Sequence, residues 1–479
     1  MKKIDTSFIF IATTSIVAVL YFSIGVNSWK FSYVGDEWIF YTFAKNLLKN
    51  PVNPFHLQGA YPETPVLGSY IQAFFLKLLG ENNFAWRLSN IICIIPLSIF
   101  FYLFLNKLFN KKVAVLGTLT MQSSFYLANF FKIGKPIPLS LVLFVALLYL
   151  GLKCAEKKSN LFLLLYGAIL GISFYIYIGP IFPVIFIPYL VFILIGKMNF
   201  KQLVASFLKV AIVYILFMSP LLIDINSSKS YFMQVSKKSI VKKEYTNNWQ
   251  MVTNIGHNFL LFYKNYDYMY NHFVSGPYLD LISRIAACVG TIYCLINWEK
   301  RSYCILLASY FLTALTIGIT SPYPYAPTTR GLFFLPFGFT LAALGIYVLY
   351  LRLSRTIRPL SIILILGAVF GLNYYQSQIG VFAEVPQNDT MRIMRFLQES
   401  KKNEKNNIVL IVSPSNNLNQ FNIKEMRQAY NLQDFNFKIS STNELNCSDY
   451  NNSALIVLRT DKEAINTFTR VCSKKISEI

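Results

Sequence analysis

The sequence predicts a polytopic α-helical membrane protein that ends in a small α/β domain, and three observations lead to this fold class. Of the 479 residues, 54% are hydrophobic and only 14% are charged, far from the balance of a soluble domain. The apolar residues form long runs, and residues 161–196 contain no Asp, Glu, Lys, Arg or His, which is enough for two membrane spans joined by a turn at GPIFP. After about residue 380 the composition changes to Asn, Lys, Ser and Gln.

The basic residues indicate which loops face the cytoplasm. The formal charge of +22 could by itself indicate a nucleic-acid partner. However, Lys and Arg gather in every second short loop between apolar runs, as the positive-inside bias of cytoplasmic loops predicts. We therefore predict membrane lipid, and no nucleic acid, as the partner of this charge. The clusters are Lys107, Lys111 and Lys112; Lys153, Lys157 and Lys158; Lys197 and Lys201; Lys300 and Arg301; and Arg352, Arg355 and Arg358.

With those loops in the cytoplasm, we expect about eleven spans, a cytoplasmic N-terminus and a C-terminus outside the plasma or inner membrane. The first span follows MKK without a small-x-small cleavage pattern, so we interpret it as a retained signal anchor. The expected spans lie near 8–28, 88–106, 113–130, 137–152, 161–178, 181–196, 203–222, 279–297, 303–320, 331–350 and 360–378.

Residues 1–379 are thus predicted to form the membrane domain, with two long external loops at 29–87 and 223–278. Residues 380–479 are predicted to form a soluble extracytoplasmic domain. In this domain the apolar runs 408–412 and 454–458 predict strands, the amphipathic stretches 391–402, 421–432 and 462–474 predict helices, and their alternation favours an α/β fold. Its two cysteines, Cys447 and Cys472, are equally compatible with a disulfide and with free thiols.

An acidic pair, Asp36–Glu37, follows the first span and precedes a helix rich in aromatic residues. The simplest interpretation is structural, because Asp is a favoured N-cap and Glu in the first turn suits the helix dipole. Alternatively, a carboxylate held at the membrane surface can act as a general base. Both interpretations can hold together, since the cap geometry would itself aim the side chain.

The whole of this loop resembles the first external loop of the GT-C glycosyltransferases, most closely the protein mannosyltransferase branch that also contains the lipid A aminoarabinose transferases. Members carry an acidic pair, an amphipathic helix, a Pro-rich turn, a second surface helix and an Arg–Leu step. The corresponding elements are Asp36–Glu37, the helix to Lys49, YPETP, residues 65–80 and Arg87–Leu88. Glu63 stands at the acid position of the PETPVLGSY stretch, but Thr64 replaces the Lys that is usual in the aminoarabinose transferases.

Two later stretches resemble the family more weakly. In LANFFKIGKPIPLSL, Lys132, Lys135 and Pro136 match basic and Pro positions of the family, whereas Ile137 replaces an acid. In TTRGLFFLPFGFTLAALG, Arg330 stands at the Arg position that opens a late span. The resemblance covers about the first 150 residues well and the late spans loosely, and it does not cover the loop at 223–278 or the C-terminal domain.

The resemblance implies a membrane glycosyltransferase that moves a sugar from a polyprenyl-phosphate donor to an acceptor at the outer face of the membrane. The acceptor is a protein, a glycolipid or a cell-envelope polysaccharide. Such a reaction needs a base for the acceptor and positive charge for the leaving phosphate. Asp36 is the candidate base, Glu37 would orient it or contact the acceptor, and Glu63 would bind the acceptor or a divalent metal. The candidates for binding the phosphate are Lys132, Lys135, Arg330 and, less favoured, Arg87.

Other interpretations stay open at this point. Lys and Arg at a bilayer surface also attract lipid head groups without any catalytic role. A transporter or flippase of a lipid-linked envelope precursor is the main alternative, although such proteins usually carry ionisable sites near the bilayer midplane. A receptor or scaffold that uses its C-terminal domain is a third. No cofactor is required by the sequence, and His257 and His272 do not have the spacing of a known ligand pair, so we predict no metal site.

Overall fold

The structure, a computed structural model, describes most of the chain. The described residues are 6–27, 37–57, 59–60, 64–156, 160–177, 179–195, 197–223, 229, 248–263, 265–266, 276–320, 330–379, 389–402, 407–413, 420–433, 436–444, 454–458, 461–472 and 477–478. Asp36, Glu63, His272 and Cys447 lie outside these ranges.

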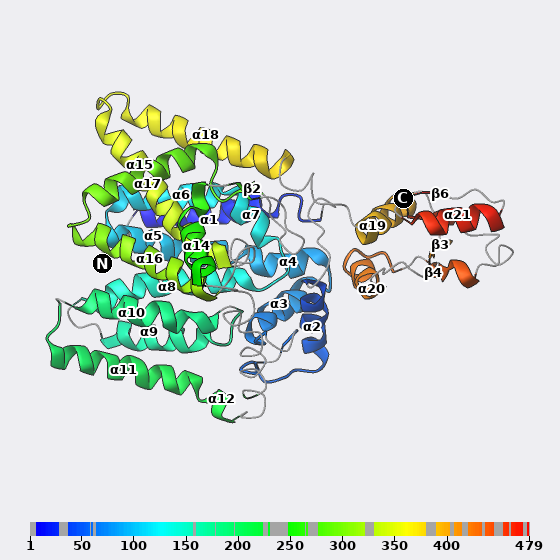
Figure 1. Ribbon diagram of the computed structural model, residues 1–479, viewed down its shortest axis with the longest axis horizontal. Helices are drawn as coiled ribbons and strands as arrows, with labels where there is room; N and C mark the ends of the chain where they lie inside the picture. Colours follow the sequence, from blue (N-terminus) through cyan, green and yellow to red (C-terminus); the bar gives the residue numbers. More distant parts are fainter. Residues whose placement is uncertain are drawn as a thin grey trace.

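A bundle of apolar helices makes up the membrane domain (Figure 1). Among the described residues, α8 and α17 are mostly buried, whereas α11 and α18 form opposite outer edges of the bundle and are mostly exposed (Figure 1). The elements of the bundle are α1 (Thr6–Ser23), α4 (Asn83–Ile91), α5 (Ile94–Leu108), α6 (Lys111–Ser123), α7 (Phe125–Phe131), α8 (Ile137–Cys154), α9 (Asn160–Ser173), η2 (Gly179–Ile181), α10 (Phe182–Leu194), α11 (Phe200–Met218), α12 (Pro220–Ile223), α15 (Leu281–Ile296), α16 (Arg301–Thr320), η6 (Gly331–Phe334), α17 (Leu335–Arg352) and α18 (Arg358–Ile379).

Seven helical segments of the described chain are long and apolar enough to cross a membrane. They agree with predicted spans, and the chain is a multi-pass membrane protein. The count of eleven stays a prediction, because the other apolar helices, including α9 and α15, are shorter than 18 residues. The seven segments are Thr6–Ser23, Asn83–Leu108, Ile137–Cys154, Phe200–Met218, Arg301–Thr320, Gly331–Arg352 and Arg358–Ser377.

Helices α15 and α17 pack closely because glycines let their backbones meet. A Cβ placed on Gly290 would lie 1.9 Å from the carbonyl oxygen of Leu341, and one placed on Gly345 would lie 1.9 Å from that of Ala286. Small residues at such contacts are typical of membrane helix pairs, whose association depends on close packing.

One predicted span is interrupted. Helix α6 ends at Ser123, and α7 begins again at Phe125 after Ser124 adopts an extended backbone. The Ser124 hydroxyl accepts a hydrogen bond from Leu127 N, and the Asn373 amide of α18 accepts one from Phe125 N at 2.9 Å. The break therefore gives α7 a direction of its own while its first backbone donors stay bonded.

Both helices predicted in the first long loop are present, as α2 (Glu37–Lys49) and α3 (Leu67–Leu79). They lie at the end of the bundle that faces the C-terminal domain (Figure 1). The described part of the second long loop contains α14 (Asn248–Phe259), η4 (Leu261–Tyr263) and a short antiparallel pair, β1 (Asn265–Tyr266) and β2 (Gly276–Pro277). Helix α14 packs on α16, where the Tyr310 hydroxyl donates to the carbonyl of Phe259 at 3.0 Å.

The predicted α/β fold of the C-terminal domain is confirmed. Four parallel strands form a sheet in the order β4-β3-β5-β6, and the two predicted strands, β3 and β5, pair at its centre. Edge strands β4 and β6 were not predicted from the sequence. The elements are α19 (Asp389–Lys402), β3 (Asn407–Val412), α20 (Gln420–Ala429), β4 (Asn436–Ser441), η7 (Thr442–Glu444), β5 (Ala454–Val457), α21 (Lys462–Val471) and β6 (Ser477–Glu478). Cys472 is disulfide-bonded, one of the two alternatives that the sequence left open, and Cys447 lies outside the described residues.

Candidate functional site

Four of the predicted site residues are brought together where the first loop meets the turn between α7 and α8. Glu37 opens α2, Arg87 lies on α4, and Lys132 and Lys135 belong to the turn. Among them, Glu37 and Arg87 are fully buried, and the two lysines are at most 7% exposed. Arg330 is half-buried directly before η6. The structure leaves the geometry of Asp36 and Glu63 undescribed, and their roles stay predictions.

A buried ion pair between Glu37 and Arg87 joins α2 to α4. Glu37 Oε1 lies 2.9 Å from Arg87 Nη2, and Arg87 Nη1 approaches Glu37 Oε2 at 3.5 Å. Arg87 also donates from Nε to Asn83 Oδ1 at 2.6 Å and from Nη1 to the carbonyl of Lys132. A buried charge is tolerated when it has an opposite charge beside it and its other polar atoms form hydrogen bonds. All three nitrogens of the Arg87 guanidinium donate hydrogen bonds here.

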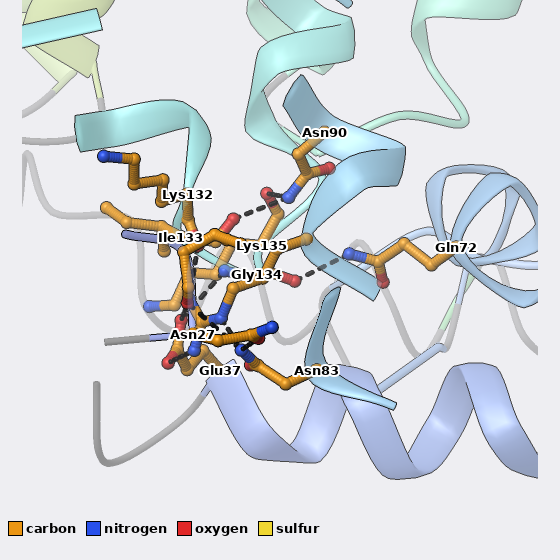
Figure 2. A network of polar contacts seen from close by, with 11 residues as sticks. Asn27, Glu37, Gln72, Asn83, Asn90, Lys132, Ile133, Gly134 and Lys135 are labelled. Carbon is orange, nitrogen blue, oxygen red and sulfur yellow. Dashed lines mark hydrogen bonds and ion pairs between the residues drawn. The ribbon is translucent and has the colours of Figure 1, made fainter. Parts of the chain in front are cut away.

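The turn at 132–135 is held by its backbone. Gly134 N donates to Glu37 Oε2 at 2.8 Å, and Gly134 O accepts from Gln72 Nε2 of α3 at 2.7 Å (Figure 2). A Cβ at Gly134 would lie 1.9 Å from the ring of Trp86, so only glycine fits this close approach. Asn90 donates to the carbonyls of Ile133 at 2.6 Å and Lys135 at 2.9 Å, which fixes the other side of the turn (Figure 2).

Of the residues that form this network, only the charged ones were predicted from the sequence. Asn83, Arg87 and Asn90 follow one another on α4 at intervals of four and three, so they share one face of the helix. That spacing of polar residues just ahead of an apolar span is the signal by which the sequence could have revealed the network. Asn83 additionally donates to Asn27 Oδ1 at 2.8 Å and so connects α4 to the end of the first span.

Aromatic rings enclose the ion pair. The Arg87 guanidinium carbon lies 5.0 Å from the ring centroid of Trp86 and 5.8 Å from that of Trp38. The two indoles pack on each other with ring centroids 5.1 Å apart, and Tyr41 packs on both. These rings exclude water from Glu37 and Arg87 and thereby strengthen their attraction.

Lys132 shares the burial of Arg87. Burial in the protein, together with the nearby charge of Arg87, lowers the pKa of Lys132 to about 7. Figure 2 shows its side chain extending away from Glu37. A lysine in this state changes charge near neutral pH, and a bound anion would favour its charged form.

The C-terminal domain rests directly on α2. Lys45 Nζ of α2 lies 2.9 Å from Glu425 Oε2 of α20, and it also donates to Gln428. Gln428 in turn donates to Glu81 Oε2 at 3.1 Å. Apolar residues of α2, α3 and the sheet domain form one buried cluster that includes Trp38. The helix that begins with Glu37 is therefore packed between the membrane domain and the soluble domain.

A metal site is not visible among the residues described. No group of three or more His, Cys, Asp and Glu side chains in that part of the chain could hold a metal ion. Asp36, Glu63 and His272 lie outside it, so the prediction of no metal is untested.

Comparison with known proteins supports the resemblance seen in the sequence. The family model described as dolichyl-phosphate-mannose-protein mannosyltransferase matches residues 63–223, which contain Arg87 and the turn at 132–135. No curated protein matches the chain by sequence.

Solved structures similar to this chain include two of an oligosaccharyltransferase from Archaeoglobus fulgidus. The structure of AglB in complex with an inhibitory peptide and a dolichol-phosphate is 13% identical, with a TM-score of 0.52, and the match covers 88% of this chain and 64% of that one. The complex of the A. fulgidus enzyme with Zn and sulfate is 14% identical, with a TM-score of 0.50, covering 88% and 62%. The chain thus spans less than two thirds of the length of these proteins.

ArnT from Cupriavidus metallidurans, bound to undecaprenyl phosphate, is 9% identical with a TM-score of 0.53, and the match covers 97% of this chain and 89% of that one. Likeness at such low identity shows the fold. The match of residues 63–223 to the mannosyltransferase family model agrees with the predicted resemblance to that family, and the solved GT-C structures share the fold of this chain.

Proposed function

We propose that this multi-pass membrane protein, which has the GT-C fold, transfers a sugar from a polyprenyl-phosphate donor to an acceptor at the outer face of the membrane. The observation that carries the proposal is the buried Glu37–Arg87 pair, which fixes the start of α2 against the basic turn at 132–135. Asp36, the proposed base, directly precedes Glu37 in the sequence, and the turn that Glu37 binds carries two buried lysines. The lipid-phosphate ligands of AglB and ArnT agree with a lipid-linked donor.

In the proposed reaction a hydroxyl or amine of the acceptor attacks the anomeric carbon of the donor sugar. The new bond forms as the bond from that carbon to the phosphate oxygen breaks, and polyprenyl phosphate leaves with the bonding electrons. Asp36 takes the proton of the acceptor. Lys135 and Arg330, with Lys132, stabilise the negative charge that develops on the phosphate.

Glu37 and Arg87 have a positioning role in this proposal. The Glu37 carboxylate accepts from Arg87 and from Gly134 N, and the Arg87 guanidinium is bonded to Glu37, Asn83 and the carbonyl of Lys132. Groups used in this way are poor candidates for binding a substrate, because every new contact would break a buried one. We therefore assign the phosphate to the lysines and Arg330.

The test supplies purified protein with either a polyprenyl-phosphate sugar or a nucleotide sugar, in the presence of acceptor peptides or lipids. Transfer from the lipid-linked donor, abolished in Asp36→Asn with unchanged membrane insertion, is the expected result. Asn keeps the size of Asp and can still cap the helix, so a purely structural Asp36 would give near-normal turnover. Efficient transfer from a nucleotide sugar without lipid would contradict the proposed donor.

Two further measurements separate the alternatives. Movement of a lipid-linked sugar across the membrane of proteoliposomes, without transfer, would favour the transporter or flippase interpretation. Transfer after treatment with a chelator, with Glu63→Gln as the companion variant, tests whether Glu63 binds a divalent metal or the acceptor. A loss that returns on adding a divalent cation to the wild type, but not to Glu63→Gln, would assign Glu63 to a metal.

A further inference from the structure

Asn129 stands out among the buried polar residues of the membrane domain. Its side chain is fully buried in the last turn of α7. Within the described residues, neither its amide nitrogen nor its amide oxygen has a hydrogen-bond partner. Leaving both ends of a buried amide without partners is costly, because each group loses the hydrogen bonds that it makes to water in the unfolded chain. Such a residue needs an explanation beyond packing.

Its place on α7 relates Asn129 to the candidate site. Lys132 follows three positions later with α-helical backbone angles, and its backbone N–H donates to the carbonyl of Asn129. Residues three apart share one face of a helix, so Asn129 and Lys132 lie on the same side of α7. Phe131 faces elsewhere, since it packs on Phe22 of α1 with ring centroids 5.7 Å apart.

The aromatic residues beside this face add a second feature. Tyr126, three positions before Asn129, is stacked on Tyr278 with ring centroids 4.3 Å apart. The break at Ser124 sets the direction of this short helix, and Asn373 secures its first backbone donor. A broken span with polar side chains is the arrangement in which membrane proteins place binding sites.

The chemistry of an amide limits what can satisfy it. Phosphate oxygens accept hydrogen bonds and would serve only the amide nitrogen, while an ammonium group would serve only the oxygen. A hydroxyl both donates and accepts, and two neighbouring hydroxyls can bond both ends of one amide. A sugar attached to a phosphate presents such hydroxyls next to the charge that Lys132 would neutralise.

We propose that Asn129 binds hydroxyl groups of the sugar carried by the lipid donor and is a specificity-determining residue of the site. The inference rests on the proposed function and assigns the sugar of the donor to Asn129. Lys132 then contacts the phosphate, and Asn129, one helical turn earlier, contacts the sugar.

The experiment measures binding of two lipids to the purified protein, a polyprenyl phosphate without a sugar and the same lipid carrying a hexose. Asn129→Leu keeps the approximate size of the side chain and removes both polar ends. It should weaken binding of the hexose-bearing lipid by about tenfold or more, while the affinity for the bare phosphate lipid stays within about twofold of wild type. Across a set of hexoses differing at single hydroxyls, the wild type should discriminate and Asn129→Leu should not.

Gln122→Met provides the matched control. Gln122 is also buried, its amide oxygen has no partner among the described residues, and it lies on α6 before the break, where its nitrogen donates to Ser15. This variant should bind both lipids as wild type does. If Asn129→Leu fails to fold, Asn129→Ser, which keeps a small polar group, replaces it and should show the same selective loss.

The outcomes separate the two levels of the proposal. Wild type that binds neither lipid would overturn the proposed function. Wild type that binds both, with Asn129→Leu unchanged for the hexose-bearing lipid, would overturn only the role of Asn129 and point to an internal water as its partner. If Asn129→Leu weakened binding of both lipids equally, Asn129 would not be a residue that binds the sugar.

Discussion

Glu37 on α2 and Arg87 on α4 are fifty positions apart in the sequence, yet their side chains meet at 2.9 Å with no exposure to solvent. The turn at 132–135 is bound to this pair, because the same carboxylate accepts a hydrogen bond from the backbone N–H of Gly134 and Arg87 donates to the carbonyl of Lys132. The pair connects the external loop, the second span and the turn after α7. The pattern of apolar residues in the sequence does not predict this contact.

Arg87→Ala should therefore destabilise the protein more than an ordinary surface substitution. Removing one member of a buried ion pair leaves an uncompensated charge and costs about 3–5 kcal/mol. The double variant Glu37→Gln/Arg87→Met, which leaves no charge, should recover part of this loss. Thermal unfolding in detergent measures both, and a double variant no more stable than Arg87→Ala would contradict the pairing as the source of the loss.

Gly134→Ala should disturb the turn at 132–135. The added Cβ would overlap the ring of Trp86, so the turn or the indole must move and the hydrogen bond to Glu37 must lengthen. We expect a marked loss of transfer and of thermal stability. Gly367→Ala is the matched control, since a Cβ at Gly367 of α18 meets no atom within 4 Å and alanine favours helix. Equal effects of the two substitutions would argue against the close approach.

The sequence alone predicts the features that depend on neighbouring residues, and it does not predict contacts between residues far apart in the chain. The apolar runs predict the spans, and the strands β3 and β5 follow from two short runs of β-branched and aliphatic residues. Strand β4 escapes prediction because NFKISS is polar and only partly buried at the edge of the sheet. Resemblance indicates that Glu37 and Arg87 matter, but their contact depends on tertiary packing across fifty residues.

The orientation in the membrane is a separate prediction from the basic loops. In a variant without the native free cysteines, Gln58→Cys, Ile240→Cys and Ser415→Cys should react with a membrane-impermeant thiol reagent applied from outside. Lys111→Cys and Arg355→Cys should react only after permeabilisation. External labelling at position 355 would reverse the orientation and move the proposed site to the cytoplasmic face.

The contact between α2 and the C-terminal domain predicts coupling between them. Lys45 and Glu425 are nearly buried, so Glu425→Lys places two like charges at 2.9 Å in the present geometry and should detach the domain from α2. The reversed pair Lys45→Glu/Glu425→Lys should restore docking. Hydrogen exchange of the backbone of α2 measures the result, which should be faster in Glu425→Lys and near wild type in the reversed pair. Unchanged exchange in the single variant would show that the apolar cluster alone holds the domain.

The charge state of Lys132 predicts how donor binding depends on pH. Burial and the charge of Arg87 lower its pKa from 10.5 to about 7. Below that pH the side chain is charged in both the folded and the unfolded chain, so its burial is most costly there. Between about 7 and 10.5 the unfolded chain binds the extra proton, and the free energy of unfolding should rise with pH across this window.

The same titration should appear in binding of the lipid donor, whose phosphodiester keeps one negative charge throughout the range. Affinity should fall as the pH rises above neutrality, with a midpoint somewhat above 7, because the bound phosphate favours the charged lysine. Lys132→Arg stays charged and should bind without this fall, while Lys132→Met should bind weakly at every pH. Binding affinity measured from pH 6 to 9 tests this assignment. An identical fall in affinity in wild type and in Lys132→Arg would assign the titration to another group.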